Sequence, residues 1–440
     1  MKVLKFGGTS VGKPDRMHHV ADLITRDNAP KIVVLSALSG TTNALVEIGD
    51  LLFGKQPDLA LKKIDSLYDH YSTFNRDLLK EEVSRENAKN IIDKHFSFIR
   101  ELTKSFFNNR LNNELLAQGE LMSTQLFKVY LDESGISSNL IWALDFMYID
   151  ESKEPDIDYI HDQLISILDT DSTQIFITQG YICRNHEGEI DNLQRGGSDY
   201  TATLIGAAIQ ATEVQIWTDI DGMHNNDPRI VDETYPIHRL SFNEASELAY
   251  FGAKILHPAS IWPTQKYSVP VCLKNTMDPE AMGTLINEVE EEKKVKAVAA
   301  KDGITAIKIK SSRMVLAYGF LRKVFEIFEN YKTPIDMITT SEVAVSLTID
   351  NNTHLPDLSR ELEQFGHVVI DENQTIICIV GNSIVEKEKI LEKVFDSMEG
   401  IPIRMISYGG SKYNISVLVD SSYKEESLKR LNKYIFKMDH

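Results

Sequence analysis

The chain has 440 residues, enough for two or three domains of ordinary size. It is 42% hydrophobic and 25% charged, which excludes wholesale disorder, and it has no apolar run near the ~20 residues that span a bilayer. Acidic residues outnumber Lys plus Arg by 65 to 47, so the net charge of −18 repels nucleic acid and requires a local basic pocket for any anionic substrate.

Three widely separated cysteines bear on the compartment of the protein. Cys183, Cys272 and Cys378 form no CxxC pair, so neither a disulfide framework nor a zinc site is expected. Glycines at positions 7, 8 and 12 interrupt the N-terminal segment too early for the apolar region of a signal peptide. These features predict a cytoplasmic protein with no metal site of its own.

The N-terminal part alternates between strands, glycine turns and helices. The pattern predicts strands at 3–6 and 31–36, turns at 7–10 and 40–43, and helices at 14–26 and 44–52. Such alternation is typical of a parallel sheet. We therefore predict an α/β domain with an open, mostly parallel sheet and helices on both faces.

The middle of the chain is more helical. Residues 59–116 are rich in Leu, Ile, Phe, Lys and Glu and contain no proline, so we expect helices there that form a lid or an edge bundle. Further strands are expected at 174–179, 214–218 and 269–273. The charged run 288–296 has no apolar face and marks the end of a catalytic domain at 1–290, although an exposed helical turn would have the same composition.

The C-terminal part contains an internal repeat of strand, helix, strand, strand and helix. The first copy, within 303–374, is predicted at 304–310, 321–331, 335–340, 343–349 and 355–365, with a closing strand at 367–371. The second, within 375–440, is predicted at 375–380, 387–398, 401–407, 414–419 and 424–435, without a closing strand. Because an unpaired sheet edge favours aggregation, we expect residues 295–301 to complete it.

The first motif is KFGGTS, residues 5–10, at the end of the first predicted strand. Paired glycines let backbone N–H groups approach an anion, and Lys5 adds a positive charge that can follow a phosphoryl group. A plain tight turn would have the same glycines. Residues 7–13 also spell the start of a P-loop, but Pro14 stands where that motif needs a hydroxyl for Mg²⁺, so we reject a P-loop.

A second glycine pair lies in RGGSD, residues 195–199. Arg195 can grip a carboxylate with its planar guanidinium, and Asp199 can orient Lys5 or accept from an amino group. The structural alternative is a helix start, with Ser198 as its cap and Asp199 beside the positive end of the helix dipole.

Later segments suit a nucleotide or an ammonium group. Thr218 and Asp219 end a predicted strand, where ligands bind in open α/β sheets, and with Arg229 they could hold a nucleoside and its phosphates. Asx and proline turns explain the same residues without a ligand. Lys254 is either a phosphate ligand or a partner of a helix dipole, and Glu120 is either an ammonium partner or an acid at a helix start.

Seven motifs, in this order, resemble the aspartate kinase family over nearly the whole chain. They are KFGGTS (5–10), GTTN (40–43), GELMS (119–123), RGGSDYTA (195–202), TDIDG (218–222), NDPR (226–229) and FGAKILHP (251–258). The tail resembles the paired ACT units of that family, each a βαββαβ fold. Residues 335–343 (IDMITTSEV) are similar to the effector-binding strand of lysine-inhibited members.

This resemblance implies transfer of the γ-phosphoryl group of ATP, carried with Mg²⁺, to the side-chain carboxylate of L-aspartate. The product would be 4-phospho-L-aspartate, in the first step of lysine, threonine and methionine biosynthesis. The residues expected to bind aspartate are Thr42, Glu120, Tyr181 (through its backbone), Arg195, Ser198 and Asp199. Those expected to bind ATP are Lys5, Gly7, Gly8, Thr218, Asp219, Arg229, Lys254 and, although relatives often carry an aromatic Tyr there, His224.

The resemblance also implies how the reaction is catalysed. Lys5 and Asp199 are the expected catalytic residues. No general base is expected, because a free aspartate side chain, with a pKa of ~3.9, is already ionised at neutral pH. The work of the site would be alignment and neutralisation of charge.

Paired ACT units imply regulation by an amino acid and assembly into at least a homodimer, or a dimer of dimers. Lysine is the expected effector, with Asp336 facing its ammonium group. The other expected contacts are Met314, Gly319, Phe320, Leu321 and Ser341.

Two other functions stay open on the sequence alone. A related kinase that acts on glutamate, carbamate or a nucleotide is disfavoured by the RGGSD segment and the two ACT-like units. A non-catalytic amino-acid sensor would have lost Lys5, Arg195 or Asp199, and all three are present.

Overall fold

A computed structural model describes residues 1–168, 174–193, 196–252, 256–291, 294–311 and 318–436, which form two compact units. The first is Met1–Met223 with Leu256–Glu288, and the second is His224–Ile255 with Val289–His440. This division differs from a single block at 1–290, because residues 224–252 pack with the C-terminal unit. Val231 lies in the apolar core of that unit, and Asn226 hydrogen-bonds within it.

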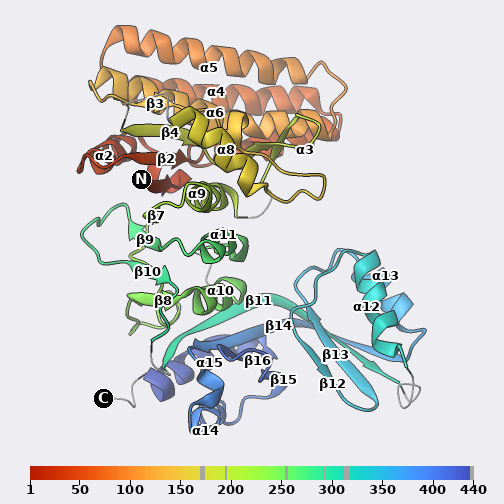
Figure 1. The fold of residues 1–440 in the computed structure, drawn as a ribbon. Coiled ribbons are helices and arrows are strands. Elements are labelled where there is room, and N and C mark those ends of the chain that lie inside the picture. Colours follow the sequence, from red (N-terminus) through yellow and green to blue (C-terminus); the bar gives the residue numbers. More distant parts are fainter. Residues whose placement is uncertain (169–173, 194–195, 253–255, 292–293, 312–317, 437–440) are drawn as a thin grey trace. The chain divides into compact units, whose positions relative to one another are not determined.

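The first unit is built on a largely parallel sheet with the strand order β3-β4-β2-β1-β7-β9-β10 (Figure 1). Its strands are β1 (Lys2–Phe6), β2 (Lys31–Leu35), β3 (Asn139–Leu140), β4 (Ile175–Gln179), β7 (Glu213–Thr218), β9 (Val271–Asn275) and β10 (Thr284–Asn287). Only β10 runs antiparallel to its neighbour β9. Every residue of β2 is buried, as expected for a strand with both faces covered. The predicted open, mostly parallel sheet is confirmed.

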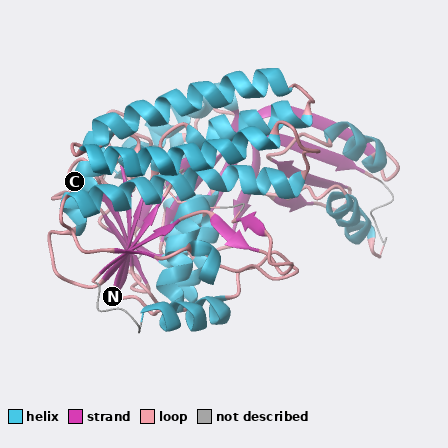
Figure 2. Ribbon diagram, turned by 90° about the horizontal axis from the view of Figure 1, so that it is seen from above, coloured by secondary structure: helices cyan, strands magenta, loops and turns pink. Residues whose placement is uncertain are grey.

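Helices cover this sheet, and three long ones lie side by side over it (Figures 1 and 2). The long helices are α4 (Pro57–Leu78), α5 (Glu82–Leu102) and α6 (Asn109–Glu133). The other helices are α1 (Gly8–Val11), α2 (Pro14–Ile24), α3 (Thr41–Phe53), α7 (Ala143–Phe146), α8 (Ile157–Leu168), α9 (Gly197–Ala208), η1 (Pro258–Ser260) and α11 (Trp262–Lys266). A separate antiparallel ribbon consists of β5 (Ile182–Arg184) and β6 (Ile190–Asn192).

The long helices form because their apolar residues repeat at helical spacing. The buried side chains of α4 fall three or four positions apart, at Ala60, Ile64, Leu67, Tyr71, Phe74 and Leu78, so they make one stripe on the helix. Pro57 stands at the start, where its missing N–H costs nothing. The helices expected within 59–116 are therefore present. Within the described part of the chain, no helix is long and apolar enough to cross a membrane.

The second unit holds an antiparallel six-stranded sheet with the order β12-β13-β11-β14-β16-β15 (Figure 1). Its strands are β11 (Val295–Lys310), β12 (Ile338–Thr340), β13 (Ala344–Ile349), β14 (His367–Gly381), β15 (Ile403–Tyr408) and β16 (Asn414–Asp420). The same unit contains β8 (Arg239–Ser241), α10 (Phe242–Tyr250), α12 (Phe320–Asn330), α13 (Leu355–Leu362), η3 (Ile384–Glu386), α14 (Ile390–Ser397), η4 (Ser421–Tyr423), α15 (Lys424–Leu431) and η5 (Asn432–Phe436).

Two long strands run through both halves of this sheet. The first part of β11 pairs with the end of β14, Val295 opposite Gly381, and the last part pairs with its beginning, Lys310 opposite His367. Residues 295–301 thus lie beside the second repeat, and what the sequence suggested as separate strands at 367–371 and 375–380 is one strand. Each half has its own apolar core under its own pair of helices.

Candidate functional site

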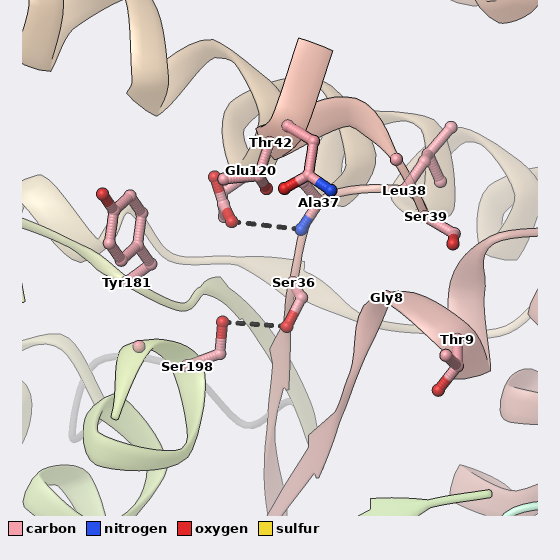
Figure 3. A pocket seen from close by; sticks show the side chains of 13 residues that line it. Gly8, Thr9, Ser36, Ala37, Leu38, Ser39, Thr42, Glu120, Tyr181 and Ser198 are labelled. Atoms are coloured by element: carbon pink, nitrogen blue, oxygen red, sulfur yellow. Dashed lines mark hydrogen bonds between the residues drawn. The ribbon is translucent and has the colours of Figure 1, made fainter. Parts of the chain in front are cut away.

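A cavity of about 420 Å³ opens in the first unit at the carboxyl ends of β1, β2 and β4 (Figure 3). Ligands bind at this edge of open parallel sheets, because the loops that leave the strands converge there. The lining residues are Gly8, Thr9, Ser36, Ala37, Leu38, Ser39, Gly40, Thr42, Asn43, Glu120, Tyr181, Gly197 and Ser198. Five separate segments of the chain therefore meet at one site.

Lys5 and Asp199 form an ion pair near this edge. The Nζ of Lys5, from β1, lies 2.6 Å from Oδ1 of Asp199, in the first turn of α9, and the two side chains are only 12% and 18% exposed. A Cβ at Gly7 would lie 3.1 Å from the same Nζ, so a larger residue would crowd the ammonium group. Asp199 thus orients Lys5, one of the two roles that the sequence left open for it.

Glu120 is buried in the middle of α6. That helix starts at Asn109 and is capped by the side chain of Asn108, so the alternative of Glu120 as an acid at a helix start is wrong. Its Oε1 accepts from the N–H of Ala37 at 3.2 Å, whereas Oε2 is buried without a hydrogen-bond partner among the residues described. Burial raises the pKa of Glu120 to about 7. A buried, half-satisfied carboxylate at a cavity wall suits a cationic group of a ligand (Figure 3).

Ser198 lies in the first turn of α9, but it does not cap the helix. The residue before the helix is Gly196, whose φ of 77° only glycine adopts readily, and no side chain caps the first turn. The structural alternative of Ser198 as a cap is therefore wrong. Its Oγ instead accepts from the hydroxyl of Ser36 at 2.8 Å (Figure 3). The carbonyl of Ser36 accepts from the hydroxyl of Ser123 at 2.8 Å.

The end of β4 brings Tyr181 to the cavity. Its φ of 68° is unusual for a residue with a side chain and is of the kind found at functional sites. The N–H of Tyr181 donates to Oγ1 of Thr201 at 2.8 Å, and its carbonyl accepts from Leu193 at 2.7 Å. Because a carbonyl can accept two hydrogen bonds, that of Tyr181 retains capacity for a ligand.

The residues expected to bind the nucleotide fall in both units. In the first, Thr218 and Asp219 end β7, and the hydroxyl of Thr218 donates to Asp219 at 3.2 Å. In the second, Arg229 is 77% exposed and donates to both carboxylate oxygens of Asp227, at 2.9 and 2.7 Å.

Three other predicted residues need separate mention. His224, in the second unit, has its Nδ1 3.0 Å from Oγ1 of Thr234. Arg195 and Lys254 lie outside the described residues.

The residues expected to bind an effector belong to the second unit. The side chain of Asp336 is 2% exposed, and its Oδ1 lies 2.6 Å from the Nζ of Lys301 and accepts from the hydroxyl of Tyr250 at 3.0 Å. Lys301 also pairs with Asp350 at 2.9 Å. Burial raises the pKa of Asp336 despite these partners, and its Oδ2 is buried with no partner in the described part of the chain.

Three of the remaining effector candidates lie at the start of α12. Gly319, with a φ of 80°, precedes the helix, and Phe320 and Leu321 are its first residues. The N–H of Ser341 donates to the carbonyl of Ala344 at 2.8 Å. Met314 is outside the described residues.

Sequence reasoning missed residues 36–39 of the cavity wall and Gly180 beside it. Ser36 was read only as the end of a buried strand, yet its hydroxyl meets Ser198. Gly180 was not singled out, although a Cβ there would lie 2.3 Å from the Cβ of Ser198, so glycine is required for α9 to approach β4. The available signal was a glycine at the end of a strand, which often marks a close approach of another backbone or a ligand.

Comparisons with known proteins agree with this arrangement. Residues 1–275 match the model of the amino acid kinase family, and residues 377–434 match an ACT domain. The lysine-sensitive aspartokinase 3 of Escherichia coli (strain K12) is 34% identical over 447 residues, which cover 99% of this chain and 99% of that protein.

Two solved structures of a related protein are similar over the whole chain. E. coli aspartokinase III in complex with aspartate and ADP (R-state) has a TM-score of 0.87 and 33% identity, covering 99% of this chain and 100% of that one. The complex with lysine and aspartate (T-state) has a TM-score of 0.80 and 34% identity, covering 99% of each chain.

Proposed function

The chain belongs to the amino acid kinase family and is an aspartokinase, and from this premise we propose that its cavity at the ends of β1, β2 and β4 phosphorylates L-aspartate on the side-chain carboxylate. The observation that carries the proposal is the pairing of two features at one sheet edge. Glu120 offers a buried oxygen that has no partner among the described residues, and Lys5 is a cation held in place by Asp199. The carboxylate of Glu120 suits the ammonium group of an amino acid, and the cation of Lys5 suits a phosphate.

Aspartate would bind with its ammonium group at Oε2 of Glu120. The carbonyl of Tyr181 and the hydroxyls of Thr42 and Ser198 lie around the same cavity and would complete the polar contacts. Arg195, from the RGGSD motif, would hold a carboxylate with its guanidinium. A related structure contains aspartate together with ADP, which supports this class of ligand.

Phosphoryl transfer asks for alignment and neutralisation of charge rather than for a base. Lys5 would face the transferring phosphoryl group, and the backbone amides around Gly7 and Gly8 would supply fixed dipoles. The substrate carboxylate attacks phosphorus, the bond to the bridging oxygen of ADP breaks, and no proton has to move. Asp199 holds the Lys5 ammonium at the end of β1.

The rest of the nucleotide would be bound by Thr218, Asp219, His224, Arg229 and Lys254. Mg²⁺, carried with ATP, neutralises phosphate charge when bound. Across the described ranges no group of His, Cys, Asp or Glu is arranged to hold a metal ion by itself.

We further propose a regulatory part with ACT-like units at 303–374 and 375–440, the second completed by 295–301, in a cytoplasmic homodimer or dimer of dimers. Lysine would be the effector, with its ammonium group at Oδ2 of Asp336, which is buried and lacks a partner in the described chain. A related structure that contains lysine supports this choice. The pairing of β11 with β14 supports the assignment of 295–301.

A coupled assay of ADP release tests the function. Purified protein with MgATP should release ADP with aspartate as acceptor, and at a background rate with glutamate or with no acceptor. Release with glutamate alone would indicate a different kinase of the family. No release with any acceptor, from a folded protein that still binds lysine, would indicate a sensor.

A further inference from the structure

Residues 224–235 form a loop that is closed on itself within the second unit. His224 forms a bridge with Pro236, the N–H of Asn225 donates to the carbonyl of Tyr235 at 3.0 Å, and the N–H of Tyr235 donates to Oδ1 of Asn225 at 2.8 Å. The carbonyl of Asn225 accepts from Val298 of β11 at 2.8 Å. This loop, which carries Arg229, is thus anchored to the regulatory sheet.

One buried side chain binds both ends of the loop. Asn432 is 3% exposed and begins a π-helical turn directly after α15. Its Oδ1 accepts from the side-chain amides of Asn225 and Asn226, at 3.2 and 3.3 Å, and its Nδ2 donates to the carbonyl of Glu233 at 3.2 Å. Turns of this kind interrupt the regular helix and are frequent at functional sites.

The contact between the loop and the helix is buried, not a surface contact. Asn225 and Asn226 are 0% and 3% exposed, and Asn226 also donates to the carbonyl of Leu428 at 3.1 Å. Val231, at the other end of the loop, lies in the apolar core with Leu431. Because water cannot replace a lost partner in such a place, removing the side-chain amide of Asn432 takes one buried hydrogen bond from each of Asn225, Asn226 and Glu233.

A chain of side-chain contacts leads from Asn432 to the guanidinium of Arg229. Asn432 accepts from Asn226, Oδ1 of Asn226 accepts from the N–H of Asp227 at 2.9 Å, and Asp227 fixes Arg229 with two hydrogen bonds. We infer that Asn432 is a positioning residue for the nucleotide segment 226–229, through which the second ACT-like unit acts on ATP binding. The inference rests on the proposed role of Arg229 in binding ATP.

The test compares four single variants and one double variant of the full chain. Asn432→Ala and Asn226→Ala should each raise the KM for ATP about tenfold, the scale of one net hydrogen bond in a buried place, and change the KM for aspartate less than about twofold. Lys433→Ala, on the exposed next residue of the same turn, is the matched control and should leave both constants unchanged. The double variant Asn226→Ala/Asn432→Ala should raise the KM for ATP by less than the product of the two single effects, because both substitutions remove the contact between these two residues.

Arg229→Ala is the reference that separates the two proposals. If it leaves the KM for ATP unchanged, the nucleotide role of Arg229 is wrong and the inference falls with it. If it raises that KM while folded Asn432→Ala and Asn226→Ala do not, only the inference is overturned. Equal rises of both KM values would indicate a general structural role and would also overturn it.

Hydrogen exchange gives a readout that does not depend on activity. The amides of residues 225, 231 and 235 should exchange faster in Asn432→Ala than in Lys433→Ala, and unchanged exchange contradicts the inference. If Asn432→Ala does not fold, Asn226→Ala, which breaks the same contact from the loop side, decides the question alone.

Discussion

At the scale of single residues, the site contains one charged side chain with an ion-pair partner, Lys5, and one buried carboxylate, Glu120, with an oxygen that has no partner among the described residues. Lys5 has its counter-ion in Asp199 before any substrate arrives, which answers the need for a fixed cation in a chain of net charge −18. Among the described residues, the carboxylate of Glu120 has the N–H of Ala37 as the partner of Oε1, and Oε2 has none. Because a ligand with an ammonium group would remove the cost of that burial, we expect the site to prefer an amino acid over a simple dicarboxylic acid.

Replacing Lys5 tests the electrostatic role directly. Lys5→Ala should lower kcat at least ~100-fold, the scale of losing one key donor in a preorganised site, without unfolding the protein. Lys2→Ala is the matched control, since Lys2 stands on the same strand and pairs only at the surface with Asp27 and Glu213, at 3.7 and 3.5 Å. Steady-state kinetics of both purified variants decides the matter, and near-normal turnover of Lys5→Ala contradicts the assignment.

Glu120 should make aspartate binding depend on pH. Burial raises its pKa to about 7, so the neutral acid prevails below that pH and the carboxylate above it. Because the carboxylate binds an ammonium group far better, kcat/KM for aspartate should rise about tenfold per pH unit up to about 7 and then level off. In Glu120→Gln the value should be low and this rise absent. A rise that persists in the variant shows that another group titrates.

At the scale of elements, the cavity exists because α9 and α6 come close to the strand ends. Gly180 lets the first turn of α9 approach β4, and left-handed Gly196 starts that helix. From the opposite side, Tyr71 of α4 shares a hydrogen bond of 3.0 Å with Thr41, the first residue of α3 and the neighbour of Thr42. The long helices therefore brace the cavity wall.

Gly180 offers a prediction about this close approach. A Cβ at that position would lie 2.3 Å from the Cβ of Ser198, so Gly180→Ala must displace the start of α9. We expect the KM for aspartate to rise at least about tenfold. Gly410→Ala, where a Cβ meets nothing within 4 Å, should behave as wild type. An unchanged KM in Gly180→Ala would show that the contact can relax without affecting the site.

The bundle of long helices should contribute strongly to the free energy of unfolding, although its packed side chains take no part in the reaction. Phe96 of α5 is fully buried and packs against the rings of Tyr68 and Tyr71, with centroids 5.3 and 5.8 Å away. Phe96→Ala should lower the free energy of unfolding by about 3–5 kcal/mol. Phe106→Ala, at a side chain 88% exposed, should change it by less than about 0.5 kcal/mol. Denaturant titration of both variants measures the difference, and equal values would contradict the role of the bundle.

At the scale of the whole molecule, the two regulatory units are parts of one sheet. Because β11 and β14 run through both, a change at β12 can reach β15 through continuous backbone hydrogen bonds. Lys301, at the centre of β11, is bound by Asp336 and Asp350. The proposed effector site and the shared strands are thus joined within this unit.

Asp336 provides the test of regulation. Wild-type activity should fall with added lysine and not with threonine, and Asp336→Asn should need at least about tenfold more lysine, because an amide binds an ammonium group much less strongly than a carboxylate. Asp357→Asn, at a side chain of α13 that is 48% exposed, is the matched control. Equal sensitivity of all three proteins to lysine would exclude Asp336 from the effector site. Light scattering of the same samples should give two or four times the mass of one chain.

The class of the sheet, the long helices and the motif residues could be predicted from the amino-acid sequence alone. Strand-turn-helix alternation and apolar spacing are local, so the first elements, the helices within 59–116 and the repeat in the tail follow from neighbouring residues. The sequence also indicated Lys5 and Asp199, because charged residues beside glycine pairs suggest a phosphate or carboxylate site, whereas Glu120 was indicated by the resemblance of its motif.

Contacts between residues far apart in the sequence became known only from the folded structure. The ion pair of Lys5 with Asp199, the burial of Glu120 within α6 and the close approach at Gly180 join residues far apart in the chain, and their spacing leaves no trace in local periodicity. The packing of residues 224–252 with the C-terminal unit is also a tertiary feature. It depends on the apolar core around Val231 and on the hydrogen bond between Asn226 and Asn432, and both form only when the chain is folded.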